Sequence, residues 1–154
     1  MGDYRKNLER AARLCSNREK CRFDVAQKMR SWGMAETEVN QALRYLEEEK
    51  FIDDERFARY FVKDKLRFNQ WGRIKIQHAL LQKRVEEDII TAALEEIDEA
   101  TYASLLDELV RKKARSLESL PPHEQKPRLL RFVAQRGFTS SEAYAAMDRF
   151  MKDH

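Results

Sequence analysis

Apolar residues recur three and four positions apart along nearly the whole chain, and no stretch of useful length alternates apolar with polar residues. Such spacing gathers apolar side chains on one face of an α-helix, whereas a half-buried strand would require alternation. The pattern therefore predicts an all-α protein. In the first part of the chain we expect helices at 4–17, from about 22 to 32, and at 35–49.

The stretch 51–85 contains the clearest helix start in the sequence. Asp53 can cap a helix, and the two acids after it would occupy the first turn, where unpaired N–H groups and the helix dipole favour negative charge. This helix should continue to residue 68. After an interruption at 69–72, a second helix is expected from about 74 to 83, and an acidic third helix at 86–98.

An aromatic stripe lies on the first helix of this stretch. Phe57, Tyr60 and Phe61 are three and four positions apart, so a single helix face carries all three rings. We expect this stripe, with Phe68, to pack inward while the neighbouring cations face solvent. Trp71 lies in the interruption, where its ring could pack between helical units or contact a partner.

Self-similarity divides the chain into three parts. The segment 29–46 recurs after shifts of 51 and 104 residues, and a further helix precedes each copy. We therefore expect three tandem three-helix repeats, at 1–50, 51–99 and 100–154. Because each repeat is small and buries limited apolar area, the repeats should stack into an elongated, curved array. Six apolar positions match in all three copies: Met29, Met34, Val39, Ala42, Leu43 and Leu46; Leu80, Val85, Ile90, Ala93, Leu94 and Ile97; and Val133, Phe138, Ala143, Ala146, Met147 and Phe150.

The third repeat differs from the others in a longer connection, 118–126, between its first and second helices. Pro127 is expected in the first turn of the following helix, where its missing N–H would have no partner in any case. Thr139 and Glu142 have the spacing of a capping box for the last helix.

The composition excludes several classes of protein. Only 4 glycines and 3 prolines accompany 37% charged residues, which is typical of a helical protein in water. No apolar run approaches the roughly 18 residues of a membrane span, and the N-terminus lacks a signal-peptide core, so we expect a cytoplasmic protein without membrane contact. The two cysteines form no CxxC pair and the three histidines are scattered, so we expect no metal. No phosphate loop, nucleophile–histidine pair or paired catalytic carboxylates are present, so we expect neither an enzyme nor a cofactor.

Charge is segregated along the chain. Residues 55–85 carry nine basic and two acidic side chains, residues 86–100 carry seven acids and no base, and residues 111–136 carry eight bases and two acids. This segregation predicts positive surfaces at particular places, although solvated helix faces are an equally plain explanation of a single charge run. The candidate partner-binding residues are Arg56, Arg59, Lys63, Arg67, Trp71, Arg73, Lys75 and Arg84 in the middle repeat, and Arg111, Lys112, Arg115, Arg128 and Arg131 in the third.

The middle stretch resembles the signature of the RecX regulatory proteins, which modulate the bacterial recombinase RecA. The resemblance rests on the run from Asp53 to Arg59, which reads DDERFAR, then on Gly72, Ile76, Leu80 and Lys83, with Leu43, Leu46, Glu47 and Glu48 leading into it. It implies an all-α protein of three three-helix repeats that binds RecA and the RecA–DNA filament, inhibits ATP hydrolysis and strand exchange, and has no catalytic site. We expect it to act as a monomer.

The chain departs from that family pattern at Arg73, Ala79 and Arg84, where proline, glutamate and glycine are frequent. Arg84 is physically unusual, because an arginine at a left-handed helix end costs about 1 kcal/mol relative to glycine. Either this helix ends differently, or Arg84 has a use that offsets the strain.

Two functional hypotheses follow. In the first, the chain is a regulator that lies along the RecA filament and either blocks monomer addition or alters the conformation that hydrolyses ATP. In the second, a three-helix unit presents a basic helix to DNA as helix-turn-helix proteins do. The acidic helix at 86–98 argues against sequence-specific reading, whereas weak nonspecific contact with nucleic acid is compatible with both hypotheses.

Overall fold

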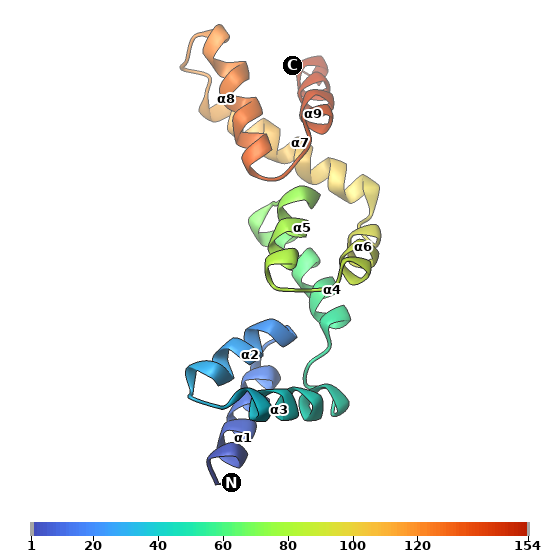
Figure 1. The fold of residues 1–154 in the computed structure, drawn as a ribbon. Helices are drawn as coiled ribbons and strands as arrows, with labels where there is room; N and C mark the ends of the chain where they lie inside the picture. Colours follow the sequence, from blue (N-terminus) through green and yellow to red (C-terminus); the bar gives the residue numbers. More distant parts are fainter. Residues whose placement is uncertain (1, 154) are drawn as a thin grey trace. The chain divides into compact units, whose positions relative to one another are not determined.

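A computed structural model describes residues 2–153, which form helices joined by short connections (Figure 1), and no strand occurs among these residues. The all-α prediction is therefore confirmed. Met1 and His154, the outer ends of the first and third predicted repeats, lie outside the described residues. The elements are α1 (Gly2–Asn17), α2 (Arg22–Ser31), α3 (Glu36–Glu48), α4 (Asp54–Asp64), the π-helical segment η1 (Lys65–Asn69), α5 (Arg73–Gln82), α6 (Glu87–Glu95), α7 (Glu99–Ser116), α8 (Pro122–Gln135) and α9 (Ser140–Asp153).

The contacts divide the chain into two compact units. Unit 1 comprises the residues up to Phe61 together with Leu80–Ala93, and unit 2 comprises Val62–Ala79 together with the residues from Leu94 onward. The predicted middle repeat, 51–99, contributes residues to both units. The predicted repeat boundaries therefore stay a prediction, although the helices follow in the expected order.

The repeated apolar positions are the ones that the fold buries. All six positions of the first copy are buried, and the matched positions of the other two copies are buried except for three that are half-buried. In unit 1 the first copy forms one hydrophobic core cluster with Ala11, Val25 and Ile52; in unit 2 the third copy joins Tyr102, Leu106 and Val110 in another. The half-buried positions are Leu94, Ile97 and Phe150.

The second helix of each repeat ends in the same left-handed turn. The residues beyond α2, α5 and α8 are Gly33, Arg84 and Gly137, with φ of 84°, 61° and 97°. In each turn this residue donates its N–H to the carbonyl three positions back, and the next residue donates to the carbonyl five positions back. Of the two alternatives for Arg84, the structure rules out a different helix end, because the residue is left-handed at a cost of about 1 kcal/mol relative to glycine.

One part of the aromatic stripe does not pack inward as predicted. Phe57 and Phe61 are buried with ring centroids 5.6 Å apart, whereas the side chains of Tyr60 and Phe68 are 39% and 71% exposed. The α-helix ends at Asp64 and continues as η1, whose π-type turn holds more residues than an α-turn. The register therefore shifts beyond Asp64, so that Leu66 packs against the core of unit 2 and Phe68 faces solvent.

Close contact of two backbones joins the start of α5 to the turn between α8 and α9 in unit 2. Gly72 donates its N–H to the carbonyl of Arg136 at 2.6 Å, and Ile74 donates to the carbonyl of Gly137 at 3.1 Å. A Cβ on Gly72 would lie 2.4 Å from the Gly137 oxygen, so only glycine fits without movement of the backbone. Two segments far apart in sequence are thereby held together.

Helix α8 starts earlier than the sequence indicated. It begins at Pro122, which takes the first helical position, and Pro127 lies inside the helix instead of in its first turn. The expected capping box of α9 does form, since Thr139 donates its N–H to Glu142 Oε1 at 2.8 Å and its Oγ1 accepts from the Glu142 N–H at 3.0 Å.

Candidate functional site

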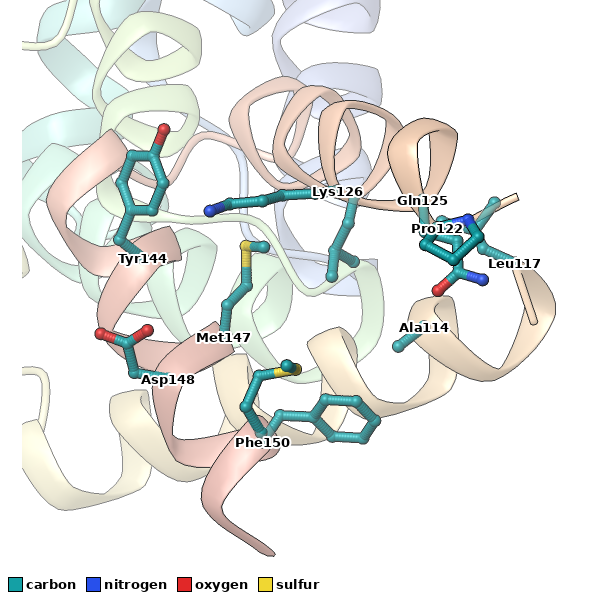
Figure 2. A pocket seen from close by; sticks show the side chains of 11 residues that line it. Ala114, Leu117, Pro122, Gln125, Lys126, Tyr144, Met147, Asp148 and Phe150 are labelled. Carbon is teal, nitrogen blue, oxygen red and sulfur yellow. The ribbon is translucent and has the colours of Figure 1, made fainter. Parts of the chain in front are cut away.

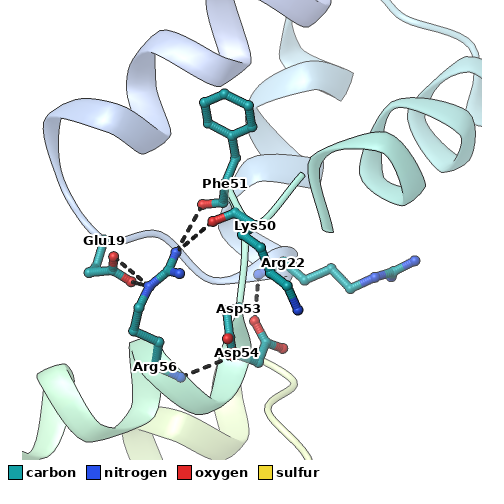
Figure 3. Close-up of polar contacts among 7 residues, drawn as sticks. All are labelled: Glu19, Arg22, Lys50, Phe51, Asp53, Asp54 and Arg56. Atoms are coloured by element: carbon teal, nitrogen blue, oxygen red, sulfur yellow. Dashed lines mark hydrogen bonds and ion pairs between the residues drawn. The ribbon is translucent and has the colours of Figure 1, made fainter. Parts of the chain in front are cut away.

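Three polar residues of the 53–56 motif, Asp53, Asp54 and Arg56, make hydrogen bonds inside unit 1 (Figure 3). Asp53 caps α4 as predicted, because its Oδ1 accepts the N–H of Arg56 at 3.1 Å. Asp54 does more than fill the first turn of its own helix: its Oδ1 accepts the N–H of Arg22, the first residue of α2, at 2.9 Å. Burial raises the pKa of Asp54, and this hydrogen bond partly opposes the rise.

Arg56 is held by four hydrogen bonds within the same unit. Its Nε donates to both carboxylate oxygens of Glu19 at 2.8 Å, and its Nη2 donates to the carbonyls of Lys50 and Phe51 at 3.1 and 3.4 Å. Figure 3 shows the guanidinium between the α1–α2 connection and the α3–α4 connection. Arg56 therefore fixes the entry of α4, and a partner would have to break these bonds to bind it.

Arg73 has a similar internal role in unit 2. Its Nη2 donates to Glu99 at 2.6 Å, its Nη1 lies 3.7 Å from Glu142, and its guanidinium carbon lies 4.0 Å from the centroid of the Tyr102 ring. Its N–H also donates to the Tyr102 hydroxyl at 3.0 Å. Burial raises the pKa of Tyr102 to about 12. These contacts tie α5 to α7 and α9.

Arg59, Lys63 and Arg67 differ from those two arginines. All three are exposed, and the described part of the chain contains no ion pair or hydrogen bond from their charged groups. Arg59 and Lys63 lie one turn apart on α4, while the guanidinium carbon of Arg67 lies 5.4 Å from the ring centroid of Phe68. Their charges are available to a partner.

Trp71 lies between two lysines of unit 2. Its half-buried ring has the ammonium nitrogens of Lys65 and Lys75 at 5.1 and 4.7 Å from the ring centroid. Lys75 also donates to the carbonyl of Gln135 at 3.4 Å. Lys65 was not among the predicted candidates, and its position beside a tryptophan depends on the π-helical turn.

The structure brings the second basic segment, 111–136, next to the middle of the first, 55–85. Arg136 donates from Nη1 to the carbonyl of Asn69, the last residue of η1, at 2.7 Å. Both Arg136 and Lys113 lie over the ring of Phe132, at 4.9 and 4.7 Å from its centroid. Lys113 and Arg136 both belong to the basic segment 111–136, for which the sequence predicted a positive surface.

The remaining candidates are Arg84 in unit 1 and five residues of α7 and α8 in unit 2. Arg84 is exposed in unit 1, 5.8 Å from the centroid of the Phe23 ring. Lys112 pairs with Glu108 at 3.2 Å in an exposed one-turn pair, a kind that adds little to stability. Arg111 is half-buried, and the exposed candidates of α7 and α8 are Arg115, Arg128 and Arg131.

An apolar groove of about 370 Å³ lies among α7, α8 and α9 (Figure 2). Leu117, Leu129 and Met147 line it, and Lys126 lies 5.5 Å from the Tyr144 ring centroid at its edge. Because its lining is mainly apolar, the groove suits contact with an apolar group. Within residues 2–153, no group of three or more His, Cys, Asp or Glu side chains is placed to hold a metal ion. No helix in that range is long and apolar enough to cross a membrane.

Two family models match the chain. They describe the second three-helix domain of RecX, at residues 53–94, and the third three-helix domain of RecX, at residues 100–147. These ranges fall inside the second and third predicted repeats.

Curated relatives extend over almost the whole chain. Regulatory protein RecX of Chlorobium limicola is 36% identical over 140 residues, which are 90% of this chain and 86% of that protein. Regulatory protein RecX of Prosthecochloris aestuarii is 31% identical over 149 residues, which are 97% and 96% of the two chains. The crystal structure of RecX from Lactobacillus salivarius has the same fold, with a TM-score of 0.83 at 18% identity over 96% of both chains.

Proposed function

Because this chain belongs to the RecX family of regulatory proteins, we propose that it regulates the bacterial recombinase RecA by binding RecA and its nucleoprotein filament. It inhibits ATP hydrolysis and strand exchange, and so acts in recombination, DNA repair and the SOS response. Its relatives are named regulatory proteins, which supports a role in regulation and not in catalysis. It works as a monomer in the cytoplasm, where its partner is.

The observation that carries this proposal is the pair of exposed cations on α4. Arg59 lies in the family-like motif, and Lys63 follows one turn later, while neighbouring Arg56 is engaged inside unit 1. A RecA filament offers both acidic protein surface and phosphate, and either attracts such unpaired charges. Arg59 and Lys63 therefore make the contact, and Arg56 holds the helix that presents them.

The first test is ATP hydrolysis by the cognate RecA on single-stranded DNA while this protein is titrated in at substoichiometric amounts. We expect a dose-dependent fall, and no fall when an unrelated basic helical protein replaces it. No inhibition at several-fold excess over RecA would refute the proposal.

The contact itself is tested by the double substitution Arg59→Glu and Lys63→Glu. Both side chains are exposed, so helical content measured by circular dichroism should stay the same while inhibition weakens at least tenfold, which corresponds to about 1.4 kcal/mol. The matched control is Lys6→Glu with Arg13→Glu, which makes the same charge change on exposed positions of α1. Equal inhibition by the two double variants would contradict a role for α4.

A further inference from the structure

We propose that unit 2 binds single-stranded nucleic acid through Phe68, whose ring stacks on an unpaired base while the cations around it contact phosphates. The binding surface, termed here the cation–aromatic stripe, runs from α8 to η1. It consists of Lys113, Arg128, Phe132, Arg136, Arg67 and Phe68.

The stripe is built by contacts within unit 2. Arg128 and Phe132 lie four positions apart on α8, and Arg136, the C-cap residue, follows four positions later, which places the three on one side of the helix. Phe132 holds Lys113 and Arg136 against its ring, and Arg136 continues to the carbonyl of Asn69, next to Phe68. Cations from both basic segments thus lead to a single exposed ring.

Phe68 is the aromatic residue of the stripe that can receive a base. Its side chain is 71% exposed, whereas Phe132 is half-buried and has cations on its ring. A lone exposed phenylalanine is common on protein surfaces. This one, however, is turned outward by a π-helical segment, a distortion frequent at functional sites, and Arg67 lies against its ring.

Nucleic acid fits this surface better than an apolar pocket of a protein does. Docking Phe68 into such a pocket would remove water from Arg67 and Arg136, and no phosphate would replace it. Proteins that bind single strands without sequence preference combine cations that follow the backbone with aromatic rings on which bases stack. The bases of a duplex are already stacked on one another, so only a single strand can use the ring of Phe68.

The test measures fluorescence anisotropy of a short labelled oligothymidylate with the whole 154-residue chain, in the absence of RecA. We expect Phe68→Ala and Phe68→Leu to weaken binding about tenfold, and Phe68→Trp to bind at least as tightly as the wild type. Leucine keeps the apolar character and loses the π face, so it separates base stacking from apolar docking. The matched control is Tyr45→Ala, at a 44% exposed ring in unit 1, which should bind like the wild type.

A duplex of the same length separates stacking from charge. Phe68→Ala should leave the affinity for the duplex unchanged. Arg128→Gln should lower the affinity for both the single strand and the duplex, and should reduce the number of counterions released on binding by about one. The proposal is overturned if the wild type does not bind the single strand, if Phe68→Leu binds like the wild type, or if Phe68→Ala weakens both forms equally. The proposal is also overturned if Phe68→Ala keeps its affinity for the single strand and loses binding to the RecA filament, because Phe68 would then contact protein.

This inference does not rest on RecA regulation, and the two can fail separately. A Phe68→Ala variant that loses single-strand affinity and still inhibits RecA supports both proposals. Wild-type protein that binds the single strand in a Phe68-dependent way and never inhibits RecA would refute the proposed function alone.

Discussion

The contact between Gly72 and Gly137 gives a quantitative prediction for the stability of unit 2. Gly72 has no left-handed backbone, so alanine is conformationally acceptable there, and only space decides the outcome. The added Cβ would lie 2.4 Å from the Gly137 oxygen and 2.8 Å from the Phe138 nitrogen, both of which are backbone atoms. The two segments must therefore move apart.

Their separation removes or weakens the hydrogen bonds Gly72 N–H to Arg136 O and Ile74 N–H to Gly137 O. Each is worth about 0.5–1.5 kcal/mol, and the forced shift adds about 1–3 kcal/mol. We therefore expect Gly72→Ala to lower the free energy of unfolding of unit 2 by about 2–6 kcal/mol. Urea unfolding, followed by Trp71 fluorescence in a Trp32→Phe background, measures this change.

Gly33→Ala is the matched control, because a Cβ there would have nothing within 4 Å. Its φ of +84° leaves only the left-handed strain, about 1–2 kcal/mol, which Trp32 fluorescence in a Trp71→Phe background would report. The reasoning is refuted if Gly72→Ala unfolds within about 0.5 kcal/mol of the wild type or loses no more stability than Gly33→Ala.

Two further predictions concern side chains that the fold uses internally. Arg56→Ala should destabilise unit 1 by about 1–2 kcal/mol in urea unfolding, a value reduced because the side chain is partly exposed to solvent. Arg59→Ala should stay within about 0.5 kcal/mol of the wild type. Equal losses of stability in the two variants would contradict the internal role of Arg56. Phenolate absorbance should show one tyrosine titrating near pH 12, and Tyr102→Phe should abolish that step. Because the raised pKa favours protonated Tyr102 in the folded state, its contribution to stability is complete below about pH 10 and is lost as the pH rises to about 12; a titration in which all tyrosines ionise together would contradict this.

Much of the fold was predictable from the sequence because its signals are local. Helical periodicity lies within each element, and the repeat aligns positions such as Met29, Leu80 and Val133, all of them buried. The alignment also placed Arg84 where the other repeats have glycine, and the left-handed turn is found there. The start of α8 was wrong because Pro127 and Pro122 are both compatible with a helix start, and local rules do not choose between them.

The candidate site was less predictable. Basic runs indicated where positive charge is dense, yet they did not distinguish Arg56 and Arg73, which are paired internally, from Arg59 and Lys63, which are exposed. Partner choice depends on residues as distant as Glu19, 37 positions from Arg56. No pattern within one helix carries that information.

The order of residues is enough to establish that this chain is all-helical, that its apolar positions repeat three times, and that its cations concentrate in two segments. These properties follow from side-chain spacing and composition, which require no knowledge of the fold. Three other features are visible only in the folded chain: a π-helical turn exposes Phe68, the backbones of Gly72 and Gly137 touch, and Arg136 reaches Asn69. Those features depend on how closely distant segments approach, and that distance is set by packing of the whole unit.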